Sequence, residues 1–380
     1  MSDEPDSSRH RSSRCERFDV VVAGGGPAGS ATAIHLARGG CRVLLVERDD
    51  FTRMRMGETL PPAVNPLLAE LGVLDDLPAL GHVPSYETAS AWGGEEVADR
   101  SFVFSPYGHG WHVDRAAFDA LLVDRAAAAG VDVHRGDVQA PRRAGSGGVV
   151  IDVGLTTVAA GHLVDATGRA ARLARRLGAS ARRFDSLVSA SVVCALPPGS
   201  AAGDTFLEAI ADGWWYASPL PGDRRLVALF TDAPIAAALR LRTPSGWWAA
   251  LQRAPRTLAL AAAGTPTAAP RLTSCAGHVL APAATPWCTV VGDAALAVDP
   301  LSSSGVSFAL RSARRAAAAI VAGGTGEDDG YDAFVGGSAV AYERERAEHY
   351  ALERRWPASE FWHRRQLHRP VTQLLLASPG

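Results

Sequence analysis

The feature that most constrains this chain is a glycine-rich hexamer, Gly24–Gly29 (GGGPAG). It follows an apolar run from Phe18 and opens an alanine-rich stretch that reaches about Arg38, and a second apolar run, Val43–Val46, ends at Glu47. This is the G-x-G-x-x-G pattern in a strand, helix, strand unit, where glycines admit a pyrophosphate and the helix N-terminus stabilises its charge. A carboxylate at the second strand end can accept both ribose hydroxyls. The alternative is a glycine-rich turn beside a solvated glutamate. The dinucleotide contacts predicted here are Gly24, Gly26, Pro27, Ala28, Gly29, Glu47 and Arg48.

A distant segment, Val290–Ala295 (VVGDAA), favours FAD over NAD. After an apolar strand, Asp293 stands at the head of a loop, where its carboxylate can hydrogen-bond a ribityl hydroxyl, a group that NAD lacks. A serine-rich loop, Asp299–Gly305, precedes a helix from Val306, whose N-terminus would stabilise an anionic reduced flavin. A helix capped by serines is the structural alternative. The added cofactor contacts are Asp293, Pro300, Ser304, Gly305 and Val306.

The 380 residues suit two domains that alternate along the chain. Residues 115–129 predict a helix and 131–134 a strand, whereas β-branched and aromatic residues gather between Ser186 and Phe230, as in an antiparallel sheet. We therefore predict an α/β fold with a Rossmann-type FAD-binding domain, an interleaved antiparallel-sheet substrate domain and a helical carboxyl terminus. The predicted segments are a disordered tail (1–17), FAD-binding parts (18–85, 111–185 and 276–330), substrate-domain parts (86–110 and 186–275) and the helical region (331–380).

Composition excludes several classes of protein. A net charge of −2 does not favour a nucleic-acid binder, and no apolar run reaches membrane-spanning length. The five cysteines are scattered and form no Cys-x-x-Cys pair, so we expect a reduced, cytoplasmic setting without a metal site. The polar first seventeen residues have no apolar core and do not predict a signal peptide.

Three further motifs carry a resemblance to a known family: Trp111–Arg115 (WHVDR), Leu163–Arg169 (LVDATGR) and Gly213–Pro219 (GWWYASP). With the two nucleotide motifs they resemble the glutathione-reductase-type flavoprotein hydroxylases and, within these, the flavin-dependent halogenases, over most of residues 18–320. The resemblance implies that Arg115 approaches the FAD and that Asp165 and Gly168 lie near it.

The chain departs from the halogenases in its basic residues. Halogenases hold a lysine between flavin and substrate to relay hypohalous acid, and all 38 basic residues here are arginine. An acidic residue of the tryptophan halogenases corresponds to Ser302, and the similar halogenase motif G-W-x-W-x-I-P is altered at Tyr216 and Ser218. These departures argue against lysine-dependent halogenation.

A narrower resemblance is to flavoprotein maturases that hydroxylate tryptophan within a protein or peptide, as in tryptophylquinone formation. The segments that carry it are Gly57–Pro62 (GETLPP), Gly213–Tyr216 (GWWY), Asp299–Gly305 and Trp356–Arg365. It implies an FAD-dependent monooxygenase that captures O2 as a flavin C4a-hydroperoxide and hydroxylates an aromatic ring, with indole favoured. The expected partner is an aromatic small molecule or a tryptophan-containing peptide or protein. Because only one dinucleotide fingerprint is evident, NAD(P)H would dock transiently or a partner reductase would supply the electrons.

Oxygen transfer to a ring needs a dry pocket, aromatic walls and at most one group that accepts a proton. The candidate base is His109 or His112, although a histidine satisfied within the fold is commoner. Glu58 follows a glycine and is expected to meet the flavin, a loop amide or solvent, and Glu343–Arg369 predicts an amphipathic helix that either clasps a peptide or covers the core. Aromatic candidates for the pocket wall, or alternatively ordinary core, are Trp92, Trp111, Trp214, Trp215 and Tyr216.

Two other functions stay open at this point. One is a reductase or dehydrogenase of the geranylgeranyl-reductase kind, which shares the architecture and a similar aromatic motif. The other is a flavin-bearing assembly protein that escorts a client without turnover.

Overall fold

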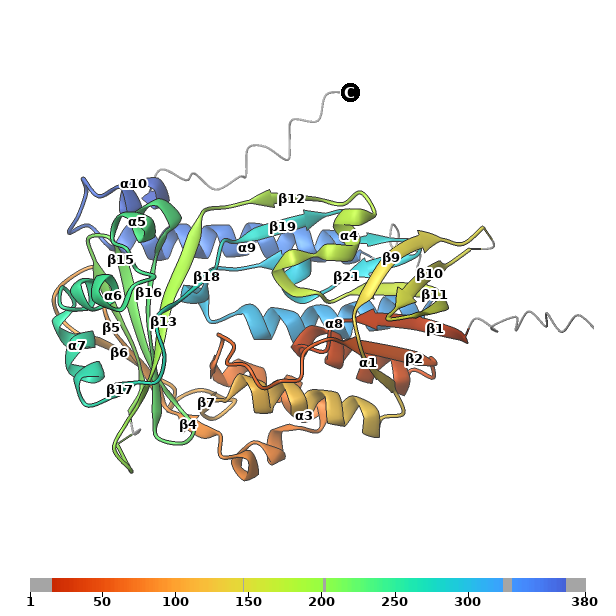
Figure 1. The fold of residues 1–380 in the computed structure, drawn as a ribbon, viewed down its shortest axis with the longest axis horizontal. Helices are drawn as coiled ribbons and strands as arrows, with labels where there is room; N and C mark the ends of the chain where they lie inside the picture. Colours follow the sequence, from red (N-terminus) through yellow and green to blue (C-terminus); the bar gives the residue numbers. More distant parts are fainter. Residues whose placement is uncertain (1–15, 146, 201–202, 324–329, 367–380) are drawn as a thin grey trace, which may run out of the picture.

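The structure, a computed structural model, describes residues 16–145, 147–200, 203–323 and 330–366. Within them a mainly parallel sheet with its helices occupies one half of the molecule, and an antiparallel sheet occupies the other (Figure 1). The predicted fold class is therefore confirmed: an α/β Rossmann-type unit with an antiparallel-sheet domain and carboxyl-terminal helices.

The parallel sheet forms from short apolar strands that are buried on both faces, as Val20, Val21 and Val22 are. In the described residues its main path runs β20-β21-β11-β1-β2-β8, with β10 and β9 attached through β11. Helices α1 (Pro27–Arg38), α3 (Arg115–Ala128) and α8 (Gly305–Val321) share its hydrophobic core. The strands are β1 (Glu16–Ala23), β2 (Val43–Glu47), β8 (Asp132–Arg135), β9 (Val138–Arg143), β10 (Val149–Val153), β11 (Thr156–Asp165), β20 (Ala284–Thr285) and β21 (Cys288–Val290).

The second large sheet is antiparallel except for the β14–β5 pair, and its path runs β17-β13-β16-β15-β14-β5-β6, with β18 beside β13. Successive side chains point to opposite faces, so Trp215 packs under helices α5 (Ala233–Ala238), α6 (Pro244–Leu251) and α7 (Pro255–Ala262), whereas Trp214 packs toward the carboxyl-terminal helices. The strands are β5 (Glu87–Ala91), β6 (Ala98–Ser101), β13 (Leu187–Ala195), β14 (Thr205–Ile210), β15 (Gly213–Leu220), β16 (Arg224–Asp232), β17 (Thr265–Pro266) and β18 (Arg271–Ser274).

Two small sheets join the halves. One has the order β3-β7-β4 and brings Thr59 opposite His112, and the other has the order β12-β19-β22. Two short helices, α2 and α4, complete this part of the fold. The strands of the two small sheets and these two helices are β3 (Thr59–Leu60), β4 (Val83–Ser85), β7 (Gly110–His112), β12 (Ser180–Arg183), β19 (His278–Ala281), β22 (Leu296–Ala297), α2 (Asn65–Leu71) and α4 (Arg172–Arg176).

The predicted single helix over 343–369 is wrong. Helix α9 (Tyr331–Leu352) ends before Pro357, and a separate helix α10 (Glu360–Gln366) follows. Glu353 is already extended, with φ −84° and ψ 113°, and Pro357 further along has no N–H with which to continue a helix. The last three residues of the predicted helix lie outside the described part of the chain.

The predicted tail also ends too late. Strand β1 begins at Glu16, and Glu16 and Arg17 already pair with β11. The remainder of the predicted tail lies outside the described residues.

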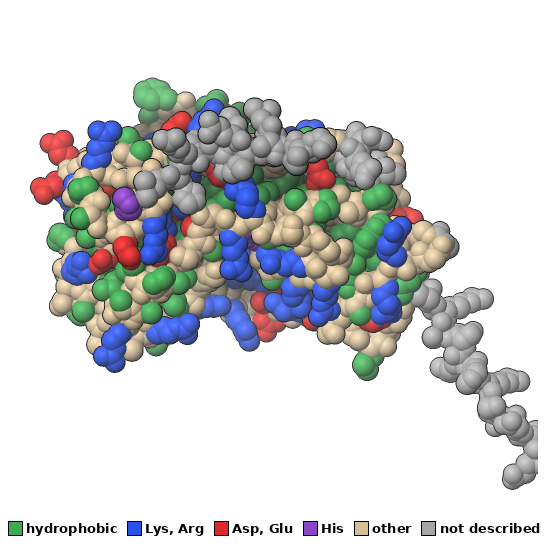
Figure 2. Space-filling model, turned by 90° about the horizontal axis from the view of Figure 1, so that it is seen from above, with side chains coloured by type: hydrophobic (Ala, Val, Ile, Leu, Met, Phe, Trp, Pro, Cys, Tyr) green, Lys and Arg blue, Asp and Glu red, His purple; other side chains and the backbone are tan. Residues whose placement is uncertain are grey.

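The surface carries charges of both signs. Figure 2 shows basic and acidic side chains interspersed with apolar ones on the face seen from above, as the small net charge leads one to expect. Over the described segments, none of the helices combines the length and the apolar character needed to cross a membrane.

Candidate active site

A cavity of about 460 Å³ extends from the carboxyl edge of the parallel sheet to the antiparallel sheet. Strands β1, β2 and β11 end at that edge, and their ends or the residues after them, Ala23, Glu47 and Ala166, line the cavity. At the opposite end the lining includes Tyr216, from β15, and Phe230, from β16. Ligands of open α/β sheets bind outside the carboxyl ends of strands, so the cavity lies where a dinucleotide is expected.

The glycine turn meets the cavity at one end, where Gly24, Gly26, Pro27 and Ala28 line it. Gly24 has φ +109°, and a Cβ there would lie 2.4 Å from the Ala166 carbonyl oxygen, so the turn requires glycine at this position. A Cβ at Gly26 would have no neighbour within 4 Å, because this residue faces open space. Gly29 does not line the cavity and instead packs against the Gly24 carbonyl oxygen.

Glu47 and Arg48 also line this end. One carboxylate oxygen of Glu47 accepts from the Gly25 amide, and the other accepts from the Asp49 amide at 2.7 Å. A carboxylate offers about four lone-pair sites, so both oxygens can still accept ribose hydroxyls.

In the second nucleotide motif, Leu163–Arg169, Asp165 and Gly168 have different positions relative to the cavity. Gly168 lines the cavity, whereas Asp165 is fully buried behind it. The Asp165 carboxylate accepts from the Thr167 amide at 2.9 Å and from the amides of Leu173 and Ala174 at 3.0 and 2.8 Å. Asp165 therefore shapes the turn that carries Gly168 and lies outside the cavity lining.

At the far end of the nucleotide unit, the loop and helix predicted from the sequence reach the cavity. Helix α8 begins with Ser304 as its N-cap residue, yet the Ser304 hydroxyl contacts Ser302 Oγ at 2.8 Å and caps no amide. The serine-cap alternative is therefore wrong, and the helix N-terminus stays open toward the cavity. Asp293 pairs with Arg169 at 3.2 Å. The predicted residues that line this end are Asp293, Pro300, Ser304, Gly305 and Val306.

Arg115 lines the cavity beside the loop after β2. Its guanidinium bonds Asp119 at 3.1 Å and the Met56 carbonyl oxygen at 2.7 Å. Gly57 has φ +99°, and a Cβ there would lie 2.7 Å from Arg115 Nη1, so glycine lets the arginine pass close to the backbone.

The sheet end of the cavity is defined here by Glu58, Thr59, Tyr216, Phe230 and Cys275. Of the three surroundings expected for Glu58, its carboxylate meets a loop amide, that of Gly57, at 2.9 Å. Glu58 is 2% exposed, and burial raises the pKa of its carboxyl group. Tyr216 hydrogen-bonds this carboxyl, and burial raises the pKa of the Tyr216 hydroxyl as well. A glutamate that follows a glycine and precedes a buried strand was the available signal, and only the pairing of β3 with β7 decides that it points inward.

Of the two candidate bases and the five candidate wall aromatics, only Tyr216 lines the cavity. His112 is buried beneath the sheet end, where its Nδ1 lies 3.3 Å from both Thr59 Oγ1 and Ser218 Oγ. Trp214 is stacked on Phe230 and donates to the Tyr350 hydroxyl at 3.1 Å, so it backs the wall instead of forming it. His109 lies at a separate surface hollow with Trp111. The other aromatic candidates that pack outside the lining are Trp92, Trp111 and Trp215.

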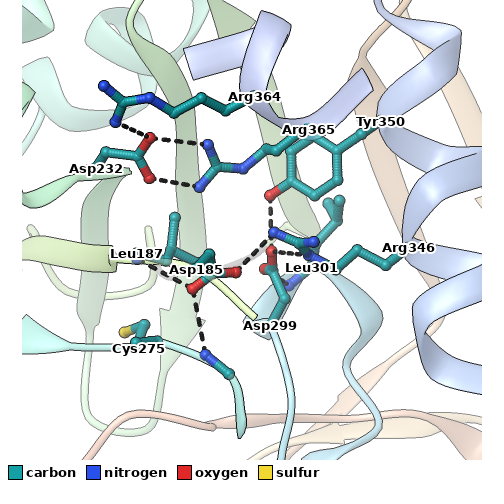
Figure 3. Close-up of polar contacts among 12 residues, drawn as sticks. Asp185, Leu187, Asp232, Cys275, Asp299, Leu301, Arg346, Tyr350, Arg364 and Arg365 are labelled. Carbon is teal, nitrogen blue, oxygen red and sulfur yellow. Dashed lines mark hydrogen bonds and ion pairs between the residues drawn. The ribbon is translucent and has the colours of Figure 1, made fainter. Parts of the chain in front are cut away.

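A buried polar cluster ties the carboxyl-terminal helices to the cavity loop (Figure 3). Asp299, which lines the cavity, accepts from the Tyr350 hydroxyl at 2.7 Å and from the Leu301 amide at 3.0 Å. Arg346 reaches Asp299 at 3.5 Å and Asp185 at 2.6 Å. Helix α9 therefore holds the loop that leads into α8.

The described residues fit FAD. Helices α1 and α8 both point an N-terminus at the cavity, and no side chain in the described part of the chain caps either one. One open helix end suits a pyrophosphate and the other suits the electron-accepting edge of a flavin, while Gly26 leaves room for close approach. Fold and cavity together define a flavin-type, dinucleotide-binding oxidoreductase.

Comparison with known proteins agrees. Residues 17–347 match the family model described as FAD binding domain, so the chain belongs to this family. LodB of Marinomonas mediterranea, whose name describes an FAD-dependent oxidoreductase, is 31% identical over 373 residues, which cover 92% of this chain and 97% of LodB. The chain is an FAD-dependent oxidoreductase of the monooxygenase and halogenase superfamily.

Two solved structures illustrate the range of this fold. CmlS, a flavin-dependent halogenase, superposes with a TM-score of 0.82 at 28% identity, covering 93% of this chain and 68% of CmlS. QhpG, a peptidyl tryptophan dihydroxylase essential for tryptophylquinone cofactor biogenesis, superposes with a TM-score of 0.70 at 27% identity, covering 92% of this chain and 79% of QhpG.

Proposed function

We propose that the protein is an FAD-dependent monooxygenase that hydroxylates an aromatic ring, with an indole, free or within a peptide, as the favoured substrate. The observation that carries this proposal is the sheet end of the cavity, where Phe230 and Tyr216 supply aromatic walls in the same cavity that the open end of α8 faces. Among the residues that line the cavity in the described chain there is no side-chain amine. The sequence contains no lysine, so the chain lacks the residue that relays hypohalous acid in halogenases.

The roles of the chain's own groups follow from this geometry. FAD, when bound and reduced, supplies the activated oxygen from O2, with NAD(P)H or a partner reductase as the electron source. The α1 N-terminus would stabilise the charge of the pyrophosphate, and the α8 N-terminus would stabilise negative charge on the reduced flavin ring. Phe230 and Tyr216 exclude water and orient a flat ring. The similarity to QhpG, a peptidyl tryptophan dihydroxylase, supports indole as the ring that is hydroxylated. It is also the reason that the proposal includes tryptophan within a peptide as a substrate.

The test is oxygen coupling. FAD-loaded protein would receive NADH or NADPH, or would be reduced photochemically, and then meet O2 with L-tryptophan, indole or a tryptophan-containing peptide. We expect one probe to give hydroxylated product and to lower the hydrogen peroxide released per O2 consumed. Peroxide that accounts for all the O2 with every probe, or reduction of an added polyprenyl double bond, would contradict the proposal and favour a reductase.

A further inference from the structure

We infer that Glu58 is the acid–base residue of this site, and that its carboxylate accepts the proton released by the aromatic ring after oxygen transfer. This inference rests on the proposed function. It replaces the expected histidine base, because His109 and His112 do not line the cavity whereas Glu58 does.

The first argument is the availability of carboxylates. In the described lining, four of the six acidic residues face an arginine: Asp49 with Arg55, Asp137 with Arg172, Asp293 with Arg169 and Asp299 with Arg346. A fifth, Glu47, lies at the glycine turn and holds two backbone amides. Glu58 lies at the sheet end, where its hydrogen bonds come from the Gly57 amide at 2.9 Å and from Tyr216. Among these carboxylates it is the one placed to meet a substrate ring.

The second argument is that the fold fixes Glu58 in place. Its carbonyl oxygen accepts from the Val113 amide at 2.7 Å, and the next residue, Thr59, pairs with His112 across β3 and β7. The left-handed backbone of Gly57 turns its amide toward the Glu58 carboxylate. Because backbone pairing holds the residue, the orientation of its carboxylate should not change when a substrate enters.

The third argument concerns basicity. Burial raises the pKa of Glu58, while Tyr216, the local amides and the charge of Arg115 oppose this shift without cancelling it. A carboxylate whose pKa is raised in this way is a stronger base than one in water. His112 lies behind Thr59, and burial lowers its pKa to about 4, so it stays neutral and adds no charge near the carboxylate.

Tyr216 acts as a positioning residue for Glu58. Its hydroxyl lies 2.8 Å from Thr59 Oγ1, which also contacts Ser218 Oγ at 2.9 Å and Thr205 Oγ1 at 3.0 Å. This hydroxyl cluster fixes the phenol, which then donates to the carboxylate.

The step balances with the reagents already named. Once oxygen has bonded to the ring carbon, the C–H bond at that carbon breaks, its electron pair restores the aromatic ring, and the proton passes to Glu58. The oxidant is O2, and the reductant is the electron donor of the proposed reaction. The proton leaves to solvent when the product departs.

The matched variants are Glu58→Gln and, as a control, Glu345→Gln on the exposed face of α9. On the probe that the wild-type protein hydroxylates, we expect Glu58→Gln to lower turnover about 100-fold or more and Glu345→Gln to leave it unchanged. Wild-type turnover should fall as pH falls through the pKa of Glu58, and this limb should vanish in Glu58→Gln. Tyr216→Phe should keep the loss of turnover at low pH but change the pH at which it occurs. Wild-type turnover and an unchanged acid limb in Glu58→Gln would overturn the inference.

A second readout separates this inference from the proposed function. Infrared titration of the FAD-loaded protein should show a protonated-carboxyl band that persists above the ordinary range of glutamate, is lost in Glu58→Gln and is retained in Glu345→Gln. If no probe is hydroxylated, the proposed function fails, and the band then decides whether Glu58 is the buried base. Absence of the band in the wild-type protein would overturn the assignment.

Discussion

Gly24 and Gly26 stand two positions apart, and glycine is needed at each for a different reason. Gly24 has a left-handed backbone and touches the Ala166 carbonyl oxygen, so the fold itself needs it. Gly26 has an ordinary φ of −73° and faces the cavity, so only a bound cofactor would need it.

Alanine at Gly24 and alanine at Gly26 should therefore have different effects, the first on stability and the second on FAD binding. Gly24→Ala is expected to destabilise the protein by about 2 kcal/mol or more, because it adds backbone strain and a clash. Gly26→Ala should leave the free energy of unfolding of the FAD-free protein within about 0.5 kcal/mol of wild type and weaken FAD binding at least about tenfold. Urea unfolding and fluorescence titration with FAD measure the two effects. Unchanged FAD affinity in Gly26→Ala would show that the pyrophosphate lies elsewhere.

His112 should make stability depend on pH. Burial lowers its pKa from 6.5 to about 4, so the unfolded chain binds the proton at a higher pH than the folded protein does. Its contribution is complete above pH 6.5 and is lost as pH falls toward 4, which amounts to about 3 kcal/mol. Unfolding of wild type and His112→Asn at several pH values should show their difference shrinking by this amount. A difference that is constant across this range would refute the buried neutral histidine.

At the residue scale, the sequence predicted which motifs surround the cofactor but not which members of a motif face it. Gly29 and Asp165 belong to nucleotide motifs, yet one packs within the turn and the other supports the turn from behind. Trp214 and Tyr216 lie two positions apart on β15 and so point to the same face of the sheet. How deeply each side chain is buried depends on the residues that pack on that face. Such distinctions depend on tertiary neighbours, which a motif does not specify.

At the scale of elements, helix α9 links the two halves of the molecule. Tyr331 at its start and Tyr342 at its middle pack in the core of the parallel sheet, and Tyr350 near its end packs with Trp214 on the antiparallel sheet. Tyr350 also donates to Asp299 in the cavity loop, and burial raises the pKa of its hydroxyl, so it remains a donor.

Tyr350→Phe should report this link. The change leaves the buried Trp214 indole N–H without its acceptor, which costs about 1–3 kcal/mol, and it removes one of the donors to Asp299. We expect that loss in urea unfolding together with several-fold weaker FAD binding. Tyr86→Phe, on a side chain that is 61% exposed, is the matched control and should change neither. If both variants behave alike, α9 does not hold the cavity loop.

The bounds of long periodic elements were predictable, whereas breaks near the carboxyl end were not. The helix expected over 115–129 and the observed α3 differ by one residue at the carboxyl end, and they begin at the same residue because Asp114 caps the first amides. The helix expected over 343–369 is interrupted from Glu353, which is extended, to Pro357, which cannot donate a helical hydrogen bond, and the aromatic and arginine pattern gave no sign of this break.

At the scale of the whole molecule, the cavity exists because three separated stretches return to one sheet edge and a second sheet closes the far end. The sequence predicted the returning stretches, since each carries a short motif with its own chemistry. It did not predict the sheet end, where Glu58 meets Tyr216, because that meeting depends on pairings between strands far apart in the chain.

The central claim is that this cavity directs one oxygen atom from O2 onto an aromatic substrate. The most direct measurement is mass spectrometry of the reaction of FAD-loaded, reduced protein with ¹⁸O2 and a tryptophan-containing peptide, in parallel with ¹⁶O2 in ¹⁸O-labelled water. The account predicts a product that carries ¹⁸O from the gas and none from the water. A product labelled only from water, or peptide that returns unmodified while O2 is consumed, would contradict it.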